Sequence, residues 1–227
     1  MQRIVAVIGG TGAEGSGLAL RFAQAGAKVL IGSRTMDKAE ATARAIATKA
    51  GAGEVHGCTN AEAARQAAIV IVTVPLSAQS ETLRSIRSHL APKSVLVDAT
   101  VPLEVAIGGR VSRTLALWDG SAAQQAARVM GSGIPIVATF HALSADALAN
   151  LAQPVDCDAL MCGDHAEAKA AVAELAESIP GVRAVDAGPL ENARFLENTA
   201  ALLIALNLRH KVKHSGIKIT GLPAAMA

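Results

Sequence analysis

The stretch from Ile4 to Gly17 constrains the fold of this chain more strongly than any other part of the sequence. It opens with a short apolar run at 4–8, rich in β-branched residues, which predicts a buried strand. The residues that follow fit the pattern G-x-G-x-x-G: Gly10, Thr11, Gly12, Ala13, Glu14 and Gly15. An amphipathic helix comes next. A strand, a glycine turn and a helix in this order predict a dinucleotide-binding unit, because the backbone and the helix N-terminus can approach a pyrophosphate there.

The end of the second predicted strand, 28–31, indicates which dinucleotide fits. Folds that bind NAD place an Asp or Glu there to hold the ribose hydroxyls, whereas this chain has Gly32-Ser33-Arg34. Ser33 can donate a hydrogen bond to a phosphate, and Arg34 can bind one through two parallel hydrogen bonds. Lys38 adds a second positive charge in the next helix. These residues predict a site for the 2′-phosphate of NADP; the alternative is that Arg34 and Lys38 are merely solvated surface residues.

The rest of the chain alternates predicted strands with predicted helices. Strands are expected at 54–57, 69–74, 94–97, 136–139, 159–162 and 183–187. Helices are expected at 37–50, 59–68, 78–90, 121–130, 166–178 and, after Pro189, to about residue 213. Hydrophobic residues make up 51% of the chain and aromatic residues only 2%, so Ala, Val, Leu and Ile must form the core. We therefore predict an α/β fold with a doubly wound, mostly parallel sheet, the Rossmann NAD(P)-binding fold.

We expect two parts in this chain. Residues 1–188 form the NADP-binding domain with its extra strands, and 189–227 form a C-terminal helical segment that completes the pocket. The middle of that segment, Ala200 to Leu206, is apolar nearly all round, which predicts burial, here in a homodimer interface. Residues 101–120 are less regular and are interpreted as an excursion near the pocket.

Composition and charge argue against several classes of protein. The net charge of +2 gives no reason to expect a nucleic-acid partner. The three cysteines form no C-x-x-C pattern, and the first strand begins by residue 4, which leaves no room for a signal peptide. No apolar run is long enough to span a membrane. We expect a cytoplasmic protein without a membrane partner, and the sequence contains no metal-ligating constellation and no catalytic triad.

Three further residues lie where predicted strands end. The carboxyl ends of the strands in a doubly wound sheet line the ligand crevice, so Val74 and Pro75 are expected near the nicotinamide half of the cofactor. His141 follows the strand predicted at 136–139 and is the one candidate for a catalytic role, in proton handling or polarisation. The alternative is a structural histidine that is hydrogen-bonded to nearby backbone.

Several blocks between residue 4 and residue 222 are specific in combination: IGGTGAEGSGLALRFAQAG, IGSRTMDKAE, VTVPL, FHALSA, MCGD, DAGPLENARFLE and HSGIKITGL. In these blocks the chain resembles the NADPH-dependent coenzyme F420 reductases (F420:NADP oxidoreductases). The resemblance implies hydride transfer between the nicotinamide of NADP and the deazaflavin of coenzyme F420. The cofactors themselves would carry this chemistry, so the protein needs no nucleophile or metal.

The resemblance also implies roles for individual residues. The pyrophosphate would meet Thr11, Gly12, Ala13 and Glu14, and the 2′-phosphate would be held by Ser33, Arg34 and Lys38. The nicotinamide would be bordered by Val74, Pro75 and Ala145. The deazaflavin would contact Leu143, Ala145, Thr199 and Ser215, with His141 nearby. Some family members read H-T-I-P-A where this chain reads HALSA at 141–145, a departure that affects the deazaflavin contacts more than the NADP contacts.

The sequence leaves two alternative functions open. The same scaffold could serve an NADP-dependent reductase of imines or small carbonyl compounds, or a non-catalytic module that senses NADP. The basic residues near the C-terminus could attract the acidic tail of the deazaflavin or could only improve solubility: Arg209, Lys211, Lys213 and Lys218.

Overall fold

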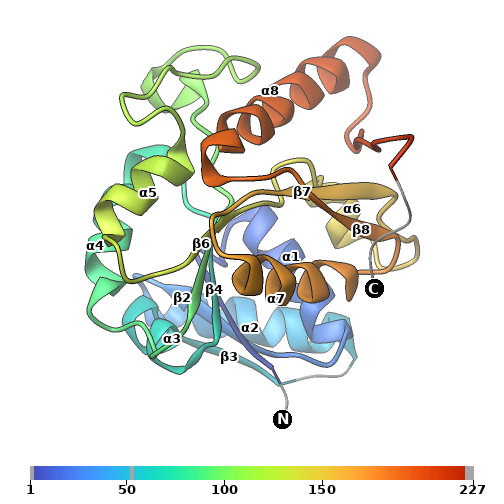
Figure 1. Ribbon diagram of the computed structural model, residues 1–227. Coiled ribbons are helices and arrows are strands. Elements are labelled where there is room, and N and C mark those ends of the chain that lie inside the picture. The colour runs from blue at the N-terminus through green and yellow to red at the C-terminus, as the bar shows by residue number, and fades with distance from the viewer. Residues whose placement is uncertain (1–2, 52–53, 223–227) are drawn as a thin grey trace.

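A six-stranded parallel sheet lies at the centre of the protein (Figure 1). The computed structural model describes residues 3–51 and 54–222, so residues 223–227 of the predicted C-terminal segment lie outside the described part. The strands are β1 Ile4–Ile8, β2 Lys28–Ser33, β3 Val55–Thr59, β4 Ile69–Val72, β5 Val95–Asp98 and β6 Ile136–Ala138. They lie in the order β3-β2-β1-β4-β5-β6, and every neighbouring pair is parallel. The predicted doubly wound sheet is confirmed.

Helices cover both faces of this sheet. They are α1 Ala13–Gln24, α2 Met36–Ala50, α3 Asn60–Gln66, α4 Leu76–Arg87 and α5 Ala122–Met130. The side chains of β1 alternate between the faces, since Val5 and Val7 share a core with α1 and α2, whereas Ala6 and Ile8 share a core with α3, α4 and α5. Burial on both faces explains why the strands read as continuous apolar runs.

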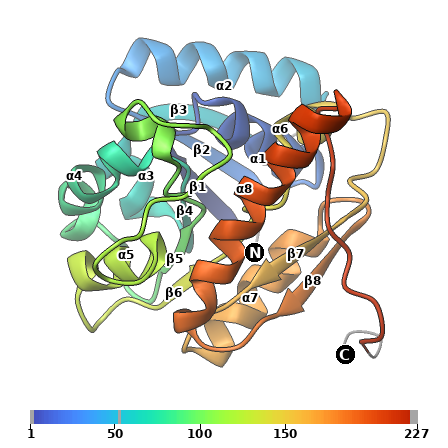
Figure 2. The ribbon, with the colours of Figure 1, turned by 90° about the horizontal axis from the view of Figure 1, so that it is seen from above.

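The strands predicted near 159–162 and 183–187 form a small sheet of their own. β7 Cys157–Met161 and β8 Val182–Asp186 pair in parallel and are connected by α7 Ala166–Glu177. An antiparallel bridge between Ala138 and Cys162 connects β6 with this small sheet. Residues of β7 and α7 belong to the same core as α1 and α2, so the extra strands cover a face of the central sheet rather than extend it (Figure 2).

A short helix that the sequence analysis did not predict, α6 Ala145–Ala149, follows β6. Its last carbonyl groups are bound by Arg21 of α1, a side chain that is only 1% exposed. The Arg21 guanidinium donates hydrogen bonds to the backbone oxygens of Leu148 at 2.9 Å and Asn150 at 2.6 Å. Because carbonyl groups at a helix C-terminus lack partners within the helix, this arginine fixes α6, and the segment before it, against α1.

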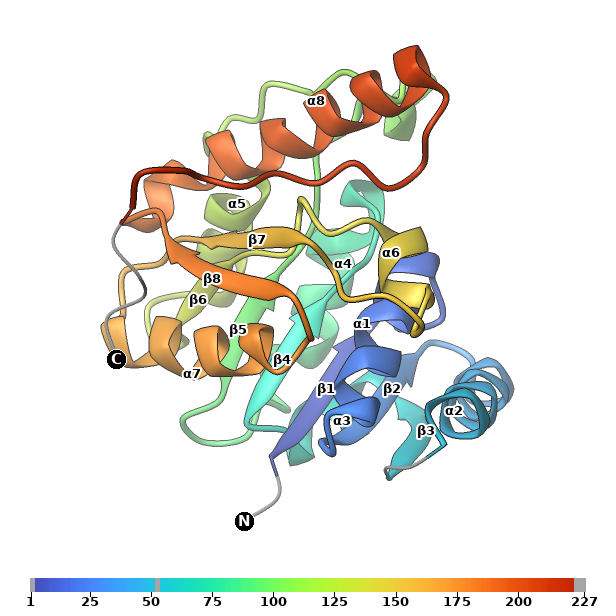
Figure 3. The same cartoon turned by 90° about the vertical axis from the view of Figure 1, so that its right-hand side faces the viewer.

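The C-terminal part consists of a long helix and an extended tail (Figure 3). The short 3-10 helix Leu190–Asn192 leads into α8 Ala193–His210, which ends at Lys211 in a left-handed conformation with φ 55°. The tail then runs beside β7, where the Asp158 N–H donates a hydrogen bond to the Ile217 oxygen at 2.8 Å. The helix predicted to about residue 213 is therefore too long, because pairing with β7, distant in sequence, sets the path of the tail. None of the helices in the described ranges is long and apolar enough to cross a membrane.

Candidate functional site

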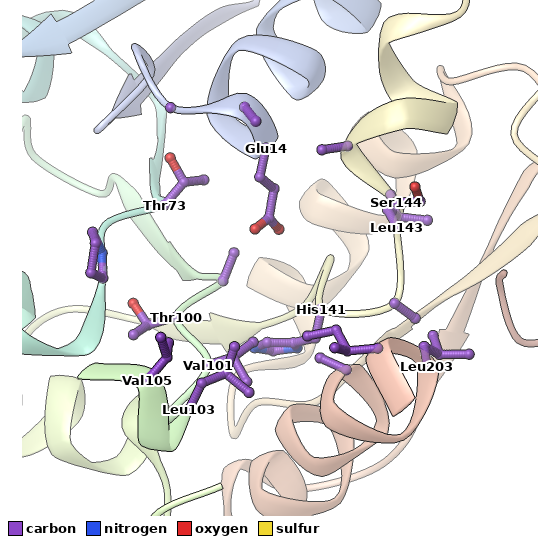
Figure 4. Close-up of a pocket in the computed structure, with 18 of the residues that line it drawn as sticks. Glu14, Thr73, Thr100, Val101, Leu103, Val105, His141, Leu143, Ser144 and Leu203 are labelled. Atoms are coloured by element: carbon purple, nitrogen blue, oxygen red, sulfur yellow. The ribbon is translucent and has the colours of Figure 1, made fainter. Parts of the chain in front are cut away.

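A cavity of about 740 Å³ lies at the carboxyl ends of the central strands, with α8 forming one of its walls (Figure 4). Four parts of the chain that are far apart in sequence line it: the N-terminus of α1, the segments after β4 and β5, the segment 141–146 and the middle of α8. Its lining includes Glu14, Thr73, Val74, Thr100, Val101, Leu103, His141, Leu143, Ala145, Leu203, Asn207 and Ser215. This is the place where doubly wound folds bind their ligands, next to the point at which the strand order reverses between β1 and β4.

A second cavity of about 240 Å³ continues from the first toward the end of β2. It is lined by Thr11, Ser33, Arg34, Lys38 and Asn60. Gly12, Thr73, Val74 and Pro75 line both cavities. The two cavities are therefore parts of one cleft, which has basic side chains at one end and largely apolar side chains at the other.

The glycine turn between β1 and α1 brings backbone to the middle of this cleft. Gly9, which precedes the predicted pattern, has φ +79°, and a Cβ atom there would lie 2.7 Å from Val74 Cγ1. At Gly15 a Cβ atom would lie 2.5 Å from Thr73 Oγ1 and 2.9 Å from Gly10 Cα. Only glycine fits these two positions without a shift of the backbone or of the side chains of Thr73 and Val74. Gly12 precedes α1 and has no side chain to cap it, so the first N–H groups of α1 are available to an anion.

The basic end of the cleft consists of Ser33, Arg34 and Lys38, which the sequence analysis predicted to lie together. Ser33 Oγ accepts a hydrogen bond from the Thr35 N–H at 3.2 Å. Arg34 and Lys38 are exposed, and neither forms an ion pair with any residue of the described ranges. Their charges are therefore free to bind a phosphate group. Asn60 Oδ1 is buried beside them without a hydrogen-bond partner in the described part of the chain.

Glu14 and His141 supply buried polar atoms to the larger cavity. Glu14 Oε1 and both ring nitrogens of His141 have no hydrogen-bond partner among the residues that the structure describes. Burial raises the pKa of the Glu14 carboxyl to about 8 and lowers the pKa of His141 to about 4. At neutral pH both groups are therefore mostly uncharged. The alternative stated for His141, a structural histidine that is hydrogen-bonded to nearby backbone, is therefore wrong.

Backbone strain occurs directly before His141. Phe140 has φ 74°, a conformation that is rare for a bulky side chain, and it is 1% exposed. Its ring packs on Phe22 of α1 with 6.1 Å between the ring centroids. Tight packing thus holds the chain in a strained turn that brings His141 and Leu143 to the cavity wall.

Most of the site residues expected from the sequence lie along the cleft. The larger cavity is lined by Gly12, Ala13, Glu14, Val74, Pro75, His141, Leu143, Ala145 and Ser215, and the smaller one by Thr11, Ser33, Arg34 and Lys38. Gly10 and Gly15 shape the turn without lining either cavity, and Thr199 lines neither, its hydroxyl donating a hydrogen bond to the Phe195 oxygen at 2.9 Å. The ligand contacts of all these residues stay predictions.

Several lining residues were missed by the sequence analysis. Thr73 follows β4, and its hydroxyl donates a hydrogen bond to the Ile8 oxygen at 3.1 Å. Ala200, Leu203 and Asn207 of α8 close the cavity from above. Their spacing along the helix was a usable signal, because it places them on one face of the helix. Of the irregular segment 101–120, Val101, Leu103, Val105 and Ala106 reach the cavity.

Comparison with known proteins identifies the family to which this chain belongs. A family model described as NADP oxidoreductase coenzyme F420-dependent matches residues 4–102. A curated protein named F420-dependent NADP reductase from Methanothermobacter thermautotrophicus is 51% identical over 222 residues, covering 96% of this chain and 95% of that protein. A protein of the same name from Methanocaldococcus jannaschii is 39% identical, with coverage of 96% and 98%.

Solved structures agree on the fold. A crystal structure from Arthrobacter sp. FB24, assigned provisionally as an F420 dependent NADP-reductase, superposes with a TM-score of 0.81 and covers 97% of this chain and 100% of that one, at 24% identity. The extent and degree of identity to the curated relatives decide the family. The chain belongs to the F420-dependent NADP reductases.

Proposed function

We propose that this protein transfers a hydride between NADP(H) and the deazaflavin coenzyme F420. The observation that carries the proposal is the single cleft, in which a basic end at Ser33, Arg34 and Lys38 continues into a largely apolar cavity of about 740 Å³. A cleft with these two ends suits a phosphorylated dinucleotide whose nicotinamide meets a second ring system. The names of the relatives support the same pair of redox partners.

The residues present fit NADP along the length of the cleft. Glycines at 9 and 15 leave room that a Cβ atom would fill, and the first N–H groups of α1 face the middle of the cleft, where a pyrophosphate would lie. Arg34 and Lys38, which form no ion pair with any described residue, are cations suited to a 2′-phosphate. The buried Asn60 Oδ1 offers an acceptor to a ribose hydroxyl or an adenine amino group. In this arrangement Val74, Pro75 and Ala145 border the nicotinamide.

The second ring system would occupy the space under α8. The deazaflavin supplies a carbon centre that accepts or donates a hydride, and the nicotinamide supplies the other such centre. Leu143 and Leu203 form apolar walls, Ser215 and Asn207 offer polar groups, and α8 covers the cavity against water. These residues act by positioning and by excluding water, a role that contributes several kcal/mol when reacting atoms are held about 3–3.5 Å apart.

The activity is tested by mixing purified protein with NADPH and oxidised F420 without oxygen and recording the deazaflavin absorbance. Bleaching that depends on both enzyme and NADPH supports the proposal. Binding of NADPH without bleaching would instead favour a sensing module. Turnover of NADPH only after an imine or a small carbonyl compound is added would favour the other reductase class. Either of those two results overturns the proposal.

We also propose that the protein forms a homodimer through α8. Phe195 and Leu202 are each 57% exposed and Leu206 is 37% exposed in the single chain, while Ala200 and Leu203 face the cavity side. An exposed apolar helix face of this kind is typical of a subunit interface. Sedimentation of the wild type should give twice the chain mass, and Leu202→Glu should give monomers. A monomeric wild type at micromolar concentration overturns this proposal.

A further inference from the structure

Glu14 is a half-buried residue with one buried carboxyl oxygen, and the hydride transfer proposed above does not use this group. Its side chain extends from the first turn of α1 into the larger cavity (Figure 4). Its Oε1 atom has no hydrogen-bond partner, and the carboxyl forms no ion pair, among the described residues. The Glu14 carboxyl can therefore become an anion that no ion pair with another described residue balances.

The other titratable groups around this cavity do not compensate that charge. His141, on the opposite wall, has both ring nitrogens unpartnered, and burial lowers its pKa to about 4. Asp146 and Lys213 line the cavity but are exposed, so water screens their charges. Asp98, at the end of β5, lies behind the wall, where Gln79 Nε2 and the Thr100 N–H donate hydrogen bonds to it at 2.7 and 2.8 Å.

We propose that Glu14 detects the charge of the nicotinamide ring. The carboxyl stays protonated when the cavity holds the neutral dihydronicotinamide of NADPH, and it ionises when the cavity holds the cationic ring of NADP⁺. In this step the carboxyl O–H bond breaks, its electron pair remains on the oxygen, and the proton passes to solvent. The inference rests on the proposed function, since it requires that the ring lies in the larger cavity.

The physical reason is the balance between burial and charge. Negative charge on a carboxyl group with a buried, unpartnered oxygen is disfavoured, and loss of hydration accordingly raises the pKa of Glu14 to about 8. An opposite charge within roughly 4–6 Å lowers the pKa of a carboxyl by about 1–3 units. The cationic ring would supply that charge, whereas the neutral ring supplies none. The protein would thus bind NADP⁺ more tightly, relative to NADPH, as the pH rises.

The experiment measures the dissociation constants of NADP⁺ and of NADPH by calorimetry between about pH 6 and about pH 9. Both forms carry the same 2′-phosphate, so their ratio cancels the titration of that group. For the wild type, the NADP⁺/NADPH ratio of dissociation constants should fall about tenfold or more over this range, since one pKa unit corresponds to tenfold. In Glu14→Gln the ratio should not change with pH. Asp146→Asn, which removes a carboxylate at the exposed rim, should behave as the wild type.

Infrared difference spectra give an independent readout on the wild type alone. At neutral pH the band of a protonated carboxyl should disappear on addition of NADP⁺ and remain on addition of NADPH. A pH-independent ratio in the wild type, or an unchanged carboxyl band, overturns the role of Glu14 while the proposed function stands. Failure of both coenzymes to bind would instead overturn the proposed function.

Discussion

The carboxyl group of Glu197, on α8, accepts a hydrogen bond at Oε2 from the backbone N–H of Ala122, the first residue of α5, at 2.9 Å. The N–H of Ala123 donates to Oε1 of the same group at 3.0 Å, and Glu197 is 1% exposed. N–H groups in the first turn of a helix have no partner within the helix, so α8 provides one from outside. This contact fixes α8 just before Ala200 and Leu203, the residues with which it closes the cavity.

We expect Glu197→Ala to destabilise the protein. The substitution leaves two buried N–H groups without acceptors and opens a space between α5 and α8, which together cost about 2–4 kcal/mol of unfolding free energy. Chemical denaturation followed by circular dichroism measures this loss. The matched control is Glu191→Ala, because Glu191 is an exposed residue just before α8. A loss no larger than that of the control contradicts the capping role.

Stability should decrease as the pH rises above neutrality. Burial raises the pKa of Glu14 and of Glu197 from 4.5 to about 8, so the native state binds more protons than the unfolded state between these values. The contribution of these groups is complete below their ordinary pKa and is lost as the pH rises through about 8. Each such proton changes the unfolding free energy by up to about 1.4 kcal/mol per pH unit.

The pH range for measuring this loss of stability begins at the ordinary pKa of histidine, about 6.5. His141, with its pKa lowered from 6.5 to about 4, acts in the opposite direction at lower pH, because the unfolded state then binds the extra proton. Denaturation of the wild type from about pH 6.5 to about pH 8.5 should show a falling free energy, and Glu14→Gln should fall less steeply. Equal slopes for the two proteins contradict the burial of the Glu14 carboxyl.

The sequence revealed those features of the fold that depend on neighbouring residues. Apolar runs at 4–8 and 69–74 predict strands because each is buried on both faces, and Ser33, Arg34 and Lys38 stand close together in the chain. The contacts of the tail with β7 and of Arg21 with α6 join residues distant in sequence, so local patterns could not predict them. That Glu14 Oε1 has no hydrogen-bond partner among the described residues is likewise a property of the assembled cavity, since a glutamate in the first turn of a helix is usually solvated.

Reversing the charge at Arg34 should abolish the preference for the phosphorylated coenzyme. In Arg34→Glu the cation that faces the smaller cavity is replaced by an anion, and a lost charge-assisted hydrogen bond costs about 1.5–3 kcal/mol. The dissociation constant of NADPH should rise about tenfold to a hundredfold, while that of NADH stays the same or falls. Arg44→Glu reverses a charge on α2, the helix that follows Arg34, outside the cavity, and should preserve the preference. An intact preference in Arg34→Glu excludes this residue from the 2′-phosphate site.

The basic residues after α8 should govern affinity for the acidic tail of the deazaflavin. Lys213 lines the larger cavity, and its backbone oxygen accepts a hydrogen bond from Ser144 Oγ at 2.9 Å, so its charge is held at the cavity mouth. The double variant Lys211→Asn, Lys213→Gln removes two charges, with asparagine chosen because it tolerates the left-handed backbone at position 211. The KM for F420 should rise several-fold, roughly as expected for lost exposed ion pairs, and should depend less on salt, while the KM for NADPH stays constant. The control is Arg84→Gln, which removes an exposed charge on α4. If the KM for F420 is the same in the double variant and in this control, the two lysines serve only solubility.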